Sequence, residues 1–193
     1  MSDLFHQQSP IVQIKLTEPK ANQPLVREIP FQGFLNLRGR PNNPDFMTAV
    51  KKVLGCSLPI ETNTVVVSGD YKIYWLGPDE WLVITPTEQQ RKVQSELISA
   101  LGVIFSSVVD NSSGVTIINI TGDNAANLIA RDCPLDLHST VFKAGQCAQT
   151  RLAKSGAMIA PLLDGSGFEL IIRRSFADYL LLWMQDALIE FEA

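Results

Sequence analysis

Two stretches of the chain predict the same order of elements, and this internal repeat limits the possible folds more than any other feature. Each stretch begins with an alternating strand that ends in glycine, and Leu35 to Gly39 aligns with Ile118 to Gly122 at an offset of 83 residues. A helix, an "LP" or "CPL" turn, further strands and a final helix follow in both. The strands "EWLVI" and "FELII" align Glu80 with Glu169 at an offset of 89, so only a short insertion separates the two alignments. The repeat predicts a pseudo-twofold pair of strand–helix–strand modules.

The first repeat contains signals for the beginning and the end of its helix. Asn43 is a suitable N-cap, Pro44 suits the first helical position, and Gly55 suits the C-terminal end. The apolar residues between them recur with helical spacing. They are Phe46, Val50, Val53 and Leu54. We therefore expect an amphipathic helix that buries one face.

Capping signals also suggest where the later helices begin. The sequence "TPTE" predicts a capping box in which Thr85 caps the helix, Pro86 takes its first position and Glu88 reaches back. In the second repeat, Asp123 is expected to cap the helix of "NAANLIAR", and Ser175 is expected to start the last helix.

Strands dominate the segments between these helices, including a hairpin predicted for "YKIYWLGPDEWLVIT". Strand-rich repeats with helices on one face predict an α+β fold. We divide the chain into an extended N-terminal arm at 1–32, a first α+β module at 33–102 and a second at 103–193, with both modules in one compact unit. The arm is rich in proline and polar residues, and its sequence fits a partner-embracing tail and simple disorder equally well.

Composition excludes several classes of function. The net charge is -4 and there is no basic stripe, so we expect no binding to nucleic acid. No window approaches about 18 uninterrupted apolar residues, so we expect no membrane span. Three cysteines without an export signal indicate reduced thiols and a cytoplasmic protein.

Few residues in the chain are of the types that catalyse reactions or bind phosphate or metal. No phosphate-binding loop occurs, and the histidines are His6, in the arm, and His138. Cys133, His138 and Cys147 are potential metal ligands, but their spacing lacks the close ligand pairs of structural zinc sites. Free cysteines are commonly buried as small apolar residues. We therefore predict no metal site, and we read His138 as a polar loop residue.

Four longer motifs together resemble the gamma subunit of heterotetrameric sarcosine oxidase. They are "LGPDEWLV", "VVDNSSGVTIINITG", "CPLDLHSTVFKAGQCAQTRLAK" and "FELIIRRSFADYLLLWMQDAL". The resemblance extends from about Phe34 to Leu188, and the run from Cys133 to Thr150 is its most specific part.

This resemblance implies a cytoplasmic bacterial complex that demethylates sarcosine to glycine, with tetrahydrofolate as the one-carbon acceptor. It implies FAD, FMN and NAD in the complex, none of them bound by this chain, and zinc in the delta subunit. The gamma subunit would join alpha, beta and delta subunits and brace chiefly alpha. Its fold is similar to the folate-binding domain of glycine-cleavage aminomethyltransferases.

The transferase pattern can be compared with the second repeat. Asp110 to Gly114 is similar to the Asp-x-Ser run of that family. The transferases then carry an acidic pair used with folate, and the matching segment here is Gly156 to Pro161. Ala160 and Pro161 occupy the acidic positions, and neither can exchange a proton. The resemblance thus implies a kept fold without the reacting group, and we predict no catalytic or cofactor-binding residues.

We therefore expect a structural, non-catalytic subunit, and two alternatives stay open. One is a stand-alone folate-binding enzyme that uses Asp110 or Asp164, and the other is a homodimeric small-molecule-binding module. Polar residues around the most specific motif are candidates for a partner interface, and the alternative is that some of them only close hydrogen bonds within their own loop. They are Asp136, His138, Gln149 and Arg151.

Overall fold

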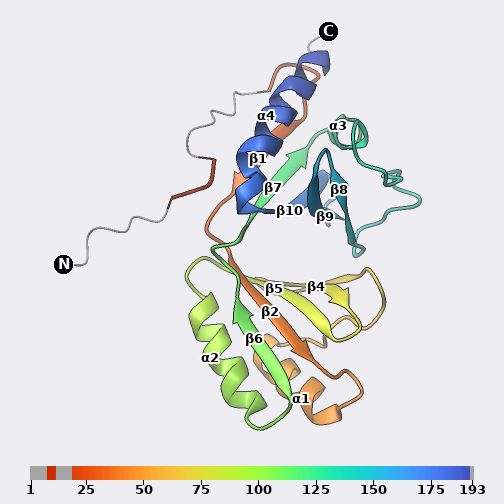
Figure 1. Cartoon of the computed structure of the whole chain (residues 1–193). Helices are drawn as coiled ribbons and strands as arrows, with labels where there is room; N and C mark the ends of the chain where they lie inside the picture. Colours follow the sequence, from red (N-terminus) through yellow and green to blue (C-terminus); the bar gives the residue numbers. More distant parts are fainter. Residues whose placement is uncertain (1–7, 12–18, 192–193) are drawn as a thin grey trace, which may run out of the picture.

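The chain folds into two antiparallel five-stranded sheets that pack face to face, with helices on both outer faces (Figure 1). The computed structural model describes residues 8–11 and 19–191. From one side to the other, the layers are helices, sheet, sheet and helices. The α+β class predicted from the repeat is confirmed. Within the described residues, no helix has the length and apolar character needed to cross a membrane.

The first sheet has the strand order β3-β4-β5-β2-β6 and is covered by two helices. Its strands are β2 (Gly33–Gly39), β3 (Val65–Ser68), β4 (Tyr71–Gly77), β5 (Glu80–Thr85) and β6 (Ser106–Asp110). Its helices are α1 (Pro44–Leu54) and α2 (Gln90–Leu101). The predicted hairpin is confirmed as β4 and β5, which pair antiparallel.

The second sheet has the order β1-β7-β10-β9-β8 and also carries helices on its outer face. Its strands are β1 (Leu25–Ile29), β7 (Val115–Thr121), β8 (Ala148–Leu152), β9 (Ser155–Pro161) and β10 (Gly167–Arg173). The helices are α3 (Ala125–Ala130) and α4 (Ala177–Leu188), with short 3-10 turns at Arg174–Phe176 and Ile189–Phe191.

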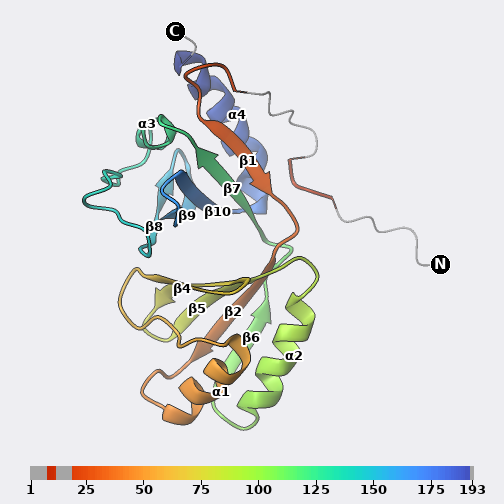
Figure 2. The same cartoon turned by 180° about the vertical axis from the view of Figure 1, so that it is seen from behind.

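The two sheets have the same internal order, and their edge strands are exchanged. Aligning β2 with β7 and β5 with β10 also aligns β3 with β8, β4 with β9, and β6 with β1. Along the chain, however, β1 leads into β2 of the first sheet but pairs with β7 of the second. Conversely, β6 leads into β7 but pairs with β2. Figure 2 shows both connections passing from one sheet to the other.

This exchange bears on the expected division of the chain. The strand β1 lies inside the expected arm at 1–32, and β6 lies inside the expected second module at 103–193. Ile11, also in the arm, is buried in the core of the second sheet. Residues 1–7 and 12–18 of the arm, including His6, lie outside the described residues. The division into an arm and two modules stays a prediction.

Strict alternation along the strands separates two sets of apolar side chains. On β5, Trp81 and Val83 face the core under α1 and α2, whereas Leu82 and Ile84 face the second sheet. The side chains of the second kind form an inter-sheet core. It consists of Phe34, Tyr74, Leu82, Ile84, Ile117, Cys147, Met158, Ala160 and Ile171. Both faces of each sheet are therefore apolar along the central strands.

Local signals predicted the first helix but misplaced the starts of the others. The Asn43 side chain accepts from the backbone of Asp45 and Phe46, and Gly55 ends α1 with a left-handed φ of 74°, as expected. The predicted capping box is wrong, because Thr85 still belongs to β5 and Glu88 has a φ of 64°.

The two start sites predicted in the second repeat are also shifted. The N-cap of α3 is Asn124 rather than Asp123. Ser175 lies in a 3-10 turn that precedes α4.

The strand exchange predicts that each repeat needs the other to complete its sheet. A fragment of residues 1–104 lacks β6, whereas a fragment of residues 1–110 keeps it. We expect the longer fragment to show the more cooperative urea unfolding by circular dichroism, because an edge strand satisfies backbone groups of β2. Adding residues 105–193 to the shorter fragment should restore cooperative unfolding. Equal cooperativity of the two fragments alone would contradict the exchange.

Candidate functional site

A buried carboxylate lies at the centre of the inter-sheet surface. Glu169, in the middle of β10, is only 3% exposed. Its strand neighbour Leu170 points to the outer helices, so the alternation of the strand directs Glu169 toward the first sheet. In the register of the second sheet, Glu169 lies between Asn119 of β7 and Ala160 of β9. A carboxylate therefore does lie beside Ala160, and it comes from the neighbouring strand.

Two side chains from the opposite sheet donate hydrogen bonds to this carboxylate. The Lys72 Nζ donates to Glu169 Oε2, and the Tyr74 hydroxyl donates to Glu169 Oε1. Lys72 and Tyr74 lie two residues apart on β4, so their side chains share the face that meets the second sheet. Hydrogen bonds to charged groups contribute more to stability than neutral ones, about 1.5–3 kcal/mol each. The cluster thus links the two sheets by directional contacts.

The environment of this cluster keeps the tyrosine neutral. Burial raises the pKa of Tyr74 well above its usual value, and the negative charge of Glu169 and the hydrogen bond to it raise the pKa further. A hydroxyl with a raised pKa keeps its proton and remains a donor. The neighbouring Asn119 Oδ1 is buried and has no hydrogen-bond partner among the described residues. The chemistry here is therefore that of a fixed ion pair rather than of a group poised to lose a proton.

The space around the cluster is too small for a folate. The cavity there has a volume of about 30 Å³, which is close to the volume that one water molecule takes in the liquid. Its walls include Val65, Val67, Pro161, Leu162 and Leu163. Sites for drug-sized ligands typically measure about 300–1,000 Å³. The residues at this position do not fit tetrahydrofolate.

The two other acids considered from the sequence close their own turns. Asp110 accepts from the backbone and side chain of Ser112, and Asp164 accepts from those of Ser166. The hydrogen bonds from Ser166 lower the pKa of Asp164. Both carboxylates are thus engaged locally.

A larger cavity of about 770 Å³ lies elsewhere, between the 137–144 loop, the start of α3 and the β9–β10 turn. Asp123, His138 and Lys143 are the charged or titratable residues among its walls. Neither Ala160 nor Glu169 lines it. Pro161, the second of the two positions where the transferase acids are expected, does line it. The cavity therefore reaches that position, but proline cannot exchange a proton there.

The residues that suggested a metal site do not come together. Cys133 is buried in the core of the second sheet, Cys147 is buried between the sheets, and His138 is exposed. Within the described part of the chain, no three histidine, cysteine or acidic side chains gather as metal ligands do. The Cys147 thiol donates to the carbonyl of Thr64, at 3.4 Å. The cysteines of this segment therefore contribute to packing.

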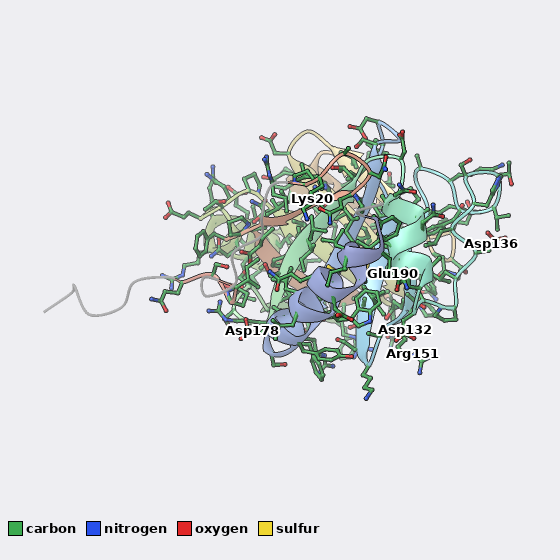
Figure 3. All side chains as sticks on the ribbon, turned by 90° about the horizontal axis from the view of Figure 1, so that it is seen from above. Lys20, Asp132, Asp136, Arg151, Asp178 and Glu190 are labelled. Carbon is green, nitrogen blue, oxygen red and sulfur yellow. The ribbon has the colours of Figure 1, made fainter. Side chains whose placement is uncertain are left out.

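The candidate interface residues are all exposed, and three of them also bond within the chain. Asp136 accepts from the backbone of His138, the His138 ring contacts Thr140, and Gln149 donates to the carbonyl of Leu76 at 2.8 Å. Arg151 lies in β8, and its side chain makes no hydrogen bond or ion pair with the described residues. Figure 3 shows Asp136 and Arg151 at the margin of the face that α4 crosses. Their role in an interface stays a prediction.

Sequence reasoning missed Glu169 as a site residue. The available signal was an acid in the middle of the apolar strand "FELII", at the position that aligns with Glu80 of the first repeat. The structure shifts that alignment by two residues, because Asn119 pairs with Glu169 whereas its counterpart Asn36 pairs with Leu82. The structural equivalent of Glu169 is therefore the apolar Leu82, and Glu80 accepts from Asn36 within its own sheet at 2.7 Å. The partners Lys72 and Tyr74 are about a hundred residues away in sequence, so no local pattern joins them to Glu169.

Comparisons with known proteins agree on one family. The model of the "Sarcosine oxidase, gamma subunit family" matches residues 38–190. Sarcosine oxidase subunit gamma of Corynebacterium sp. (strain U-96) is 31% identical over 87% of this chain and 80% of the relative. The protein of the same name from Corynebacterium sp. (strain P-1) is 30% identical over 86% of this chain and 80% of the relative.

Solved structures add the fold. A chain of the heterotetrameric sarcosine oxidase from Corynebacterium sp. U-96 aligns over 97% of both chains with a TM-score of 0.88 and 26% identity. The glycine cleavage system aminomethyltransferase T from Bartonella henselae aligns over 84% of this chain and 45% of that chain, with a TM-score of 0.61 and 14% identity. The second similarity concerns the fold alone, and it confirms the predicted aminomethyltransferase-like architecture.

The contact between Tyr74 and Glu169 predicts a specific loss of stability. Tyr74→Phe removes a donor from a buried carboxylate, so we expect the free energy of unfolding to fall by about 1–3 kcal/mol. Tyr71→Phe is the matched control, because Tyr71 lies on the same strand and its hydroxyl makes no hydrogen bond with the described residues. The control should change stability by less than about 0.5 kcal/mol. Urea unfolding measures both, and equal effects would argue against the contact.

Burial predicts an unreactive thiol at Cys147. Burial raises the pKa of Cys147 to about 11, and a backbone hydrogen bond at Trp75 acts weakly in the opposite direction. Because the thiolate is the reactive form, iodoacetamide at pH 8 should modify Cys147 at least about 100-fold more slowly in the folded chain than in urea. Its rate should rise with pH toward the pKa. Peptide mass spectrometry follows this rate, with the half-exposed Cys56 as internal control. Equal rates at both cysteines would contradict the assignment.

Proposed function

The chain belongs to the sarcosine oxidase gamma subunit family, and from this premise we propose that it is a structural subunit of a heterotetrameric sarcosine oxidase with no catalytic residue of its own. The observation that carries the proposal is the state of Glu169. This carboxylate lies beside Ala160, but Lys72 and Tyr74 occupy it and the adjacent cavity is about 30 Å³. A general acid or base must come within hydrogen-bond reach of its substrate. A carboxylate enclosed in this way is out of reach.

The role that remains is assembly. We propose that the chain braces the alpha subunit of a cytoplasmic complex that also contains beta and delta subunits. In this proposal the other subunits hold FAD, FMN, NAD and tetrahydrofolate and carry out the demethylation of sarcosine to glycine. The similarity to a chain of a heterotetrameric enzyme along 97% of both chains supports a shared place in such an assembly.

The interface proposed for this contact includes the motif from Cys133 to Thr150 and its neighbour Arg151. Arg151 is exposed and unpaired among the described residues, which leaves its guanidinium available for a carboxylate of the partner. Asp136 accepts from the backbone N–H of His138, and the His138 ring contacts Thr140, so both side chains stabilise the shape of their loop. The loop therefore presents a fixed surface rather than one that must be ordered on binding, which lowers the entropic cost of association.

Co-expression with the neighbouring sarcosine oxidase subunits tests the proposal. We expect the chain to co-purify with the alpha subunit, and we expect the isolated chain to give no sarcosine-dependent hydrogen peroxide and no micromolar binding of tetrahydrofolate. Arg151→Glu should weaken association with alpha about tenfold, or about 1.4 kcal/mol. Lys52→Glu, an exposed change on α1, is the matched control and should leave association unchanged.

Other outcomes would favour the alternatives. Turnover by the isolated chain would overturn the non-catalytic role. Micromolar tetrahydrofolate binding, weakened by Asp110→Ala or Asp164→Ala, would indicate a stand-alone folate-binding enzyme. A stable homodimer that ignores the alpha subunit in light scattering would indicate a separate small-molecule-binding module. If only Arg151→Glu lacks an effect, the interface lies on another surface and the assembly role stands.

A further inference from the structure

We propose that Glu169 and Tyr74 form a recognition site for a primary alkylammonium group, and that the chain fills this site with its own Lys72 side chain. The inference concerns binding rather than reaction, so it goes beyond the proposed function, although both use the contact of Glu169 with Lys72 and Tyr74. In this view Lys72 is a tethered ligand that closes the space between the two sheets.

The recognising groups and the cation differ in how deeply they lie. Glu169 is 3% exposed and Tyr74 is 2% exposed, so the acceptor and its supporting hydroxyl are fixed inside the protein. The Lys72 side chain is 36% exposed and reaches them from the solvent side. Glu169 Oε1 accepts from Tyr74, which leaves Oε2 for the ammonium. The arrangement is that of a buried receptor and a partly exposed ligand.

The walls of the site suit an unbranched alkyl chain. The space beside the ion pair is lined by aliphatic side chains of β3 and of the β9–β10 turn. They are Val65, Val67, Leu162 and Leu163, with Ala160 and Pro161 next to them. Such walls can pack on methylene groups while the head group meets the carboxylate, as lysine stems commonly do. The volume left beside Lys72, about 30 Å³, admits no larger ligand while the lysine is in place.

The chemistry selects primary ammonium over quaternary ammonium. Lys72 donates N–H to Glu169, and a quaternary nitrogen has no N–H to donate. Recognition of methylated ammonium typically uses a cage of several aromatic rings. Tyr74 is the aromatic residue among the walls of this cavity. A ligand of about three carbons with a terminal NH₃⁺ matches the part of lysine that lies beyond Cβ.

Removing the tether should therefore create a site that a free amine can fill. Lys72→Ala leaves a buried carboxylate without its cation, which is strongly destabilising. We expect the variant to unfold at a lower temperature than the unaltered chain. n-Propylammonium chloride, between about 1 and 100 mM, should raise its melting temperature in a saturable manner by about 2–4 °C, because a ligand that binds only the folded state stabilises it.

Matched salts and variants make the result specific. Tetramethylammonium chloride and sodium chloride at the same ionic strength should have no saturable effect on Lys72→Ala. n-Propylammonium should not shift the unaltered chain, whose site is filled. The double change Lys72→Ala with Glu169→Gln should lose the rescue, because the ammonium then lacks its charged partner.

Each contrary outcome overturns the proposal. A flat response of Lys72→Ala to n-propylammonium does so, and so does an equal response of the unaltered chain or of the double variant. If Lys72→Ala does not fold without ligand, its refolding yield from urea is compared in n-propylammonium and in tetramethylammonium. Equal yields again overturn the site. None of these measurements involves sarcosine turnover or subunit assembly, so failure here can be distinguished from failure of the proposed function.

Discussion

The contact between Glu169 on one sheet and Lys72 and Tyr74 on the other defines how the two halves of the molecule meet. A carboxylate at this depth is strongly unfavourable unless it is paired and hydrogen-bonded. The relative position of β10 and β4 is therefore tied to these two donors. The same contact engages the carboxylate that lies beside Ala160 and leaves little free volume around it. One contact thus both links the two sheets and encloses this acid.

Around this contact, the inter-sheet core stabilises the packing without fixing its direction, and the strand exchange joins the two repeats. Apolar side chains of both sheets bury surface against one another, which stabilises the packing roughly in proportion to area. The exchange of β1 and β6 adds backbone pairing that joins the repeats through both connections. Apolar packing alone tolerates small rotations of one sheet over the other. A buried carboxylate with two donors from the opposite sheet favours one alignment of β10 with β4.

Signals in the sequence succeeded where the deciding contacts were local. Asn43, Pro44 and Gly55 delimit α1 because a cap acts within a few residues of itself. The capping box at Thr85 failed because Thr85 still pairs with Gly33 of β2, a contact about fifty residues away that keeps it in β5. The sequence did not identify Glu169 as a site residue for a related reason. Alternation along β10 shows that it faces away from Leu170, but the same pattern describes a face that meets water and a face that meets another sheet.

The sequence by itself determined the repeat, the α+β class, the first helix and, through its long motifs, the family. These properties depend on the order of residues and on contacts within a few positions of the chain. Only the tertiary structure decided that the edge strands are exchanged, that the two sheets face each other, and that Lys72 and Tyr74 enclose Glu169. Those features arise from pairs of residues that lie far apart in the chain, from 67 positions for Gly39 and Ser106 to 97 for Lys72 and Glu169. Whether such residues meet depends on how both sheets pack, and no local pattern encodes it.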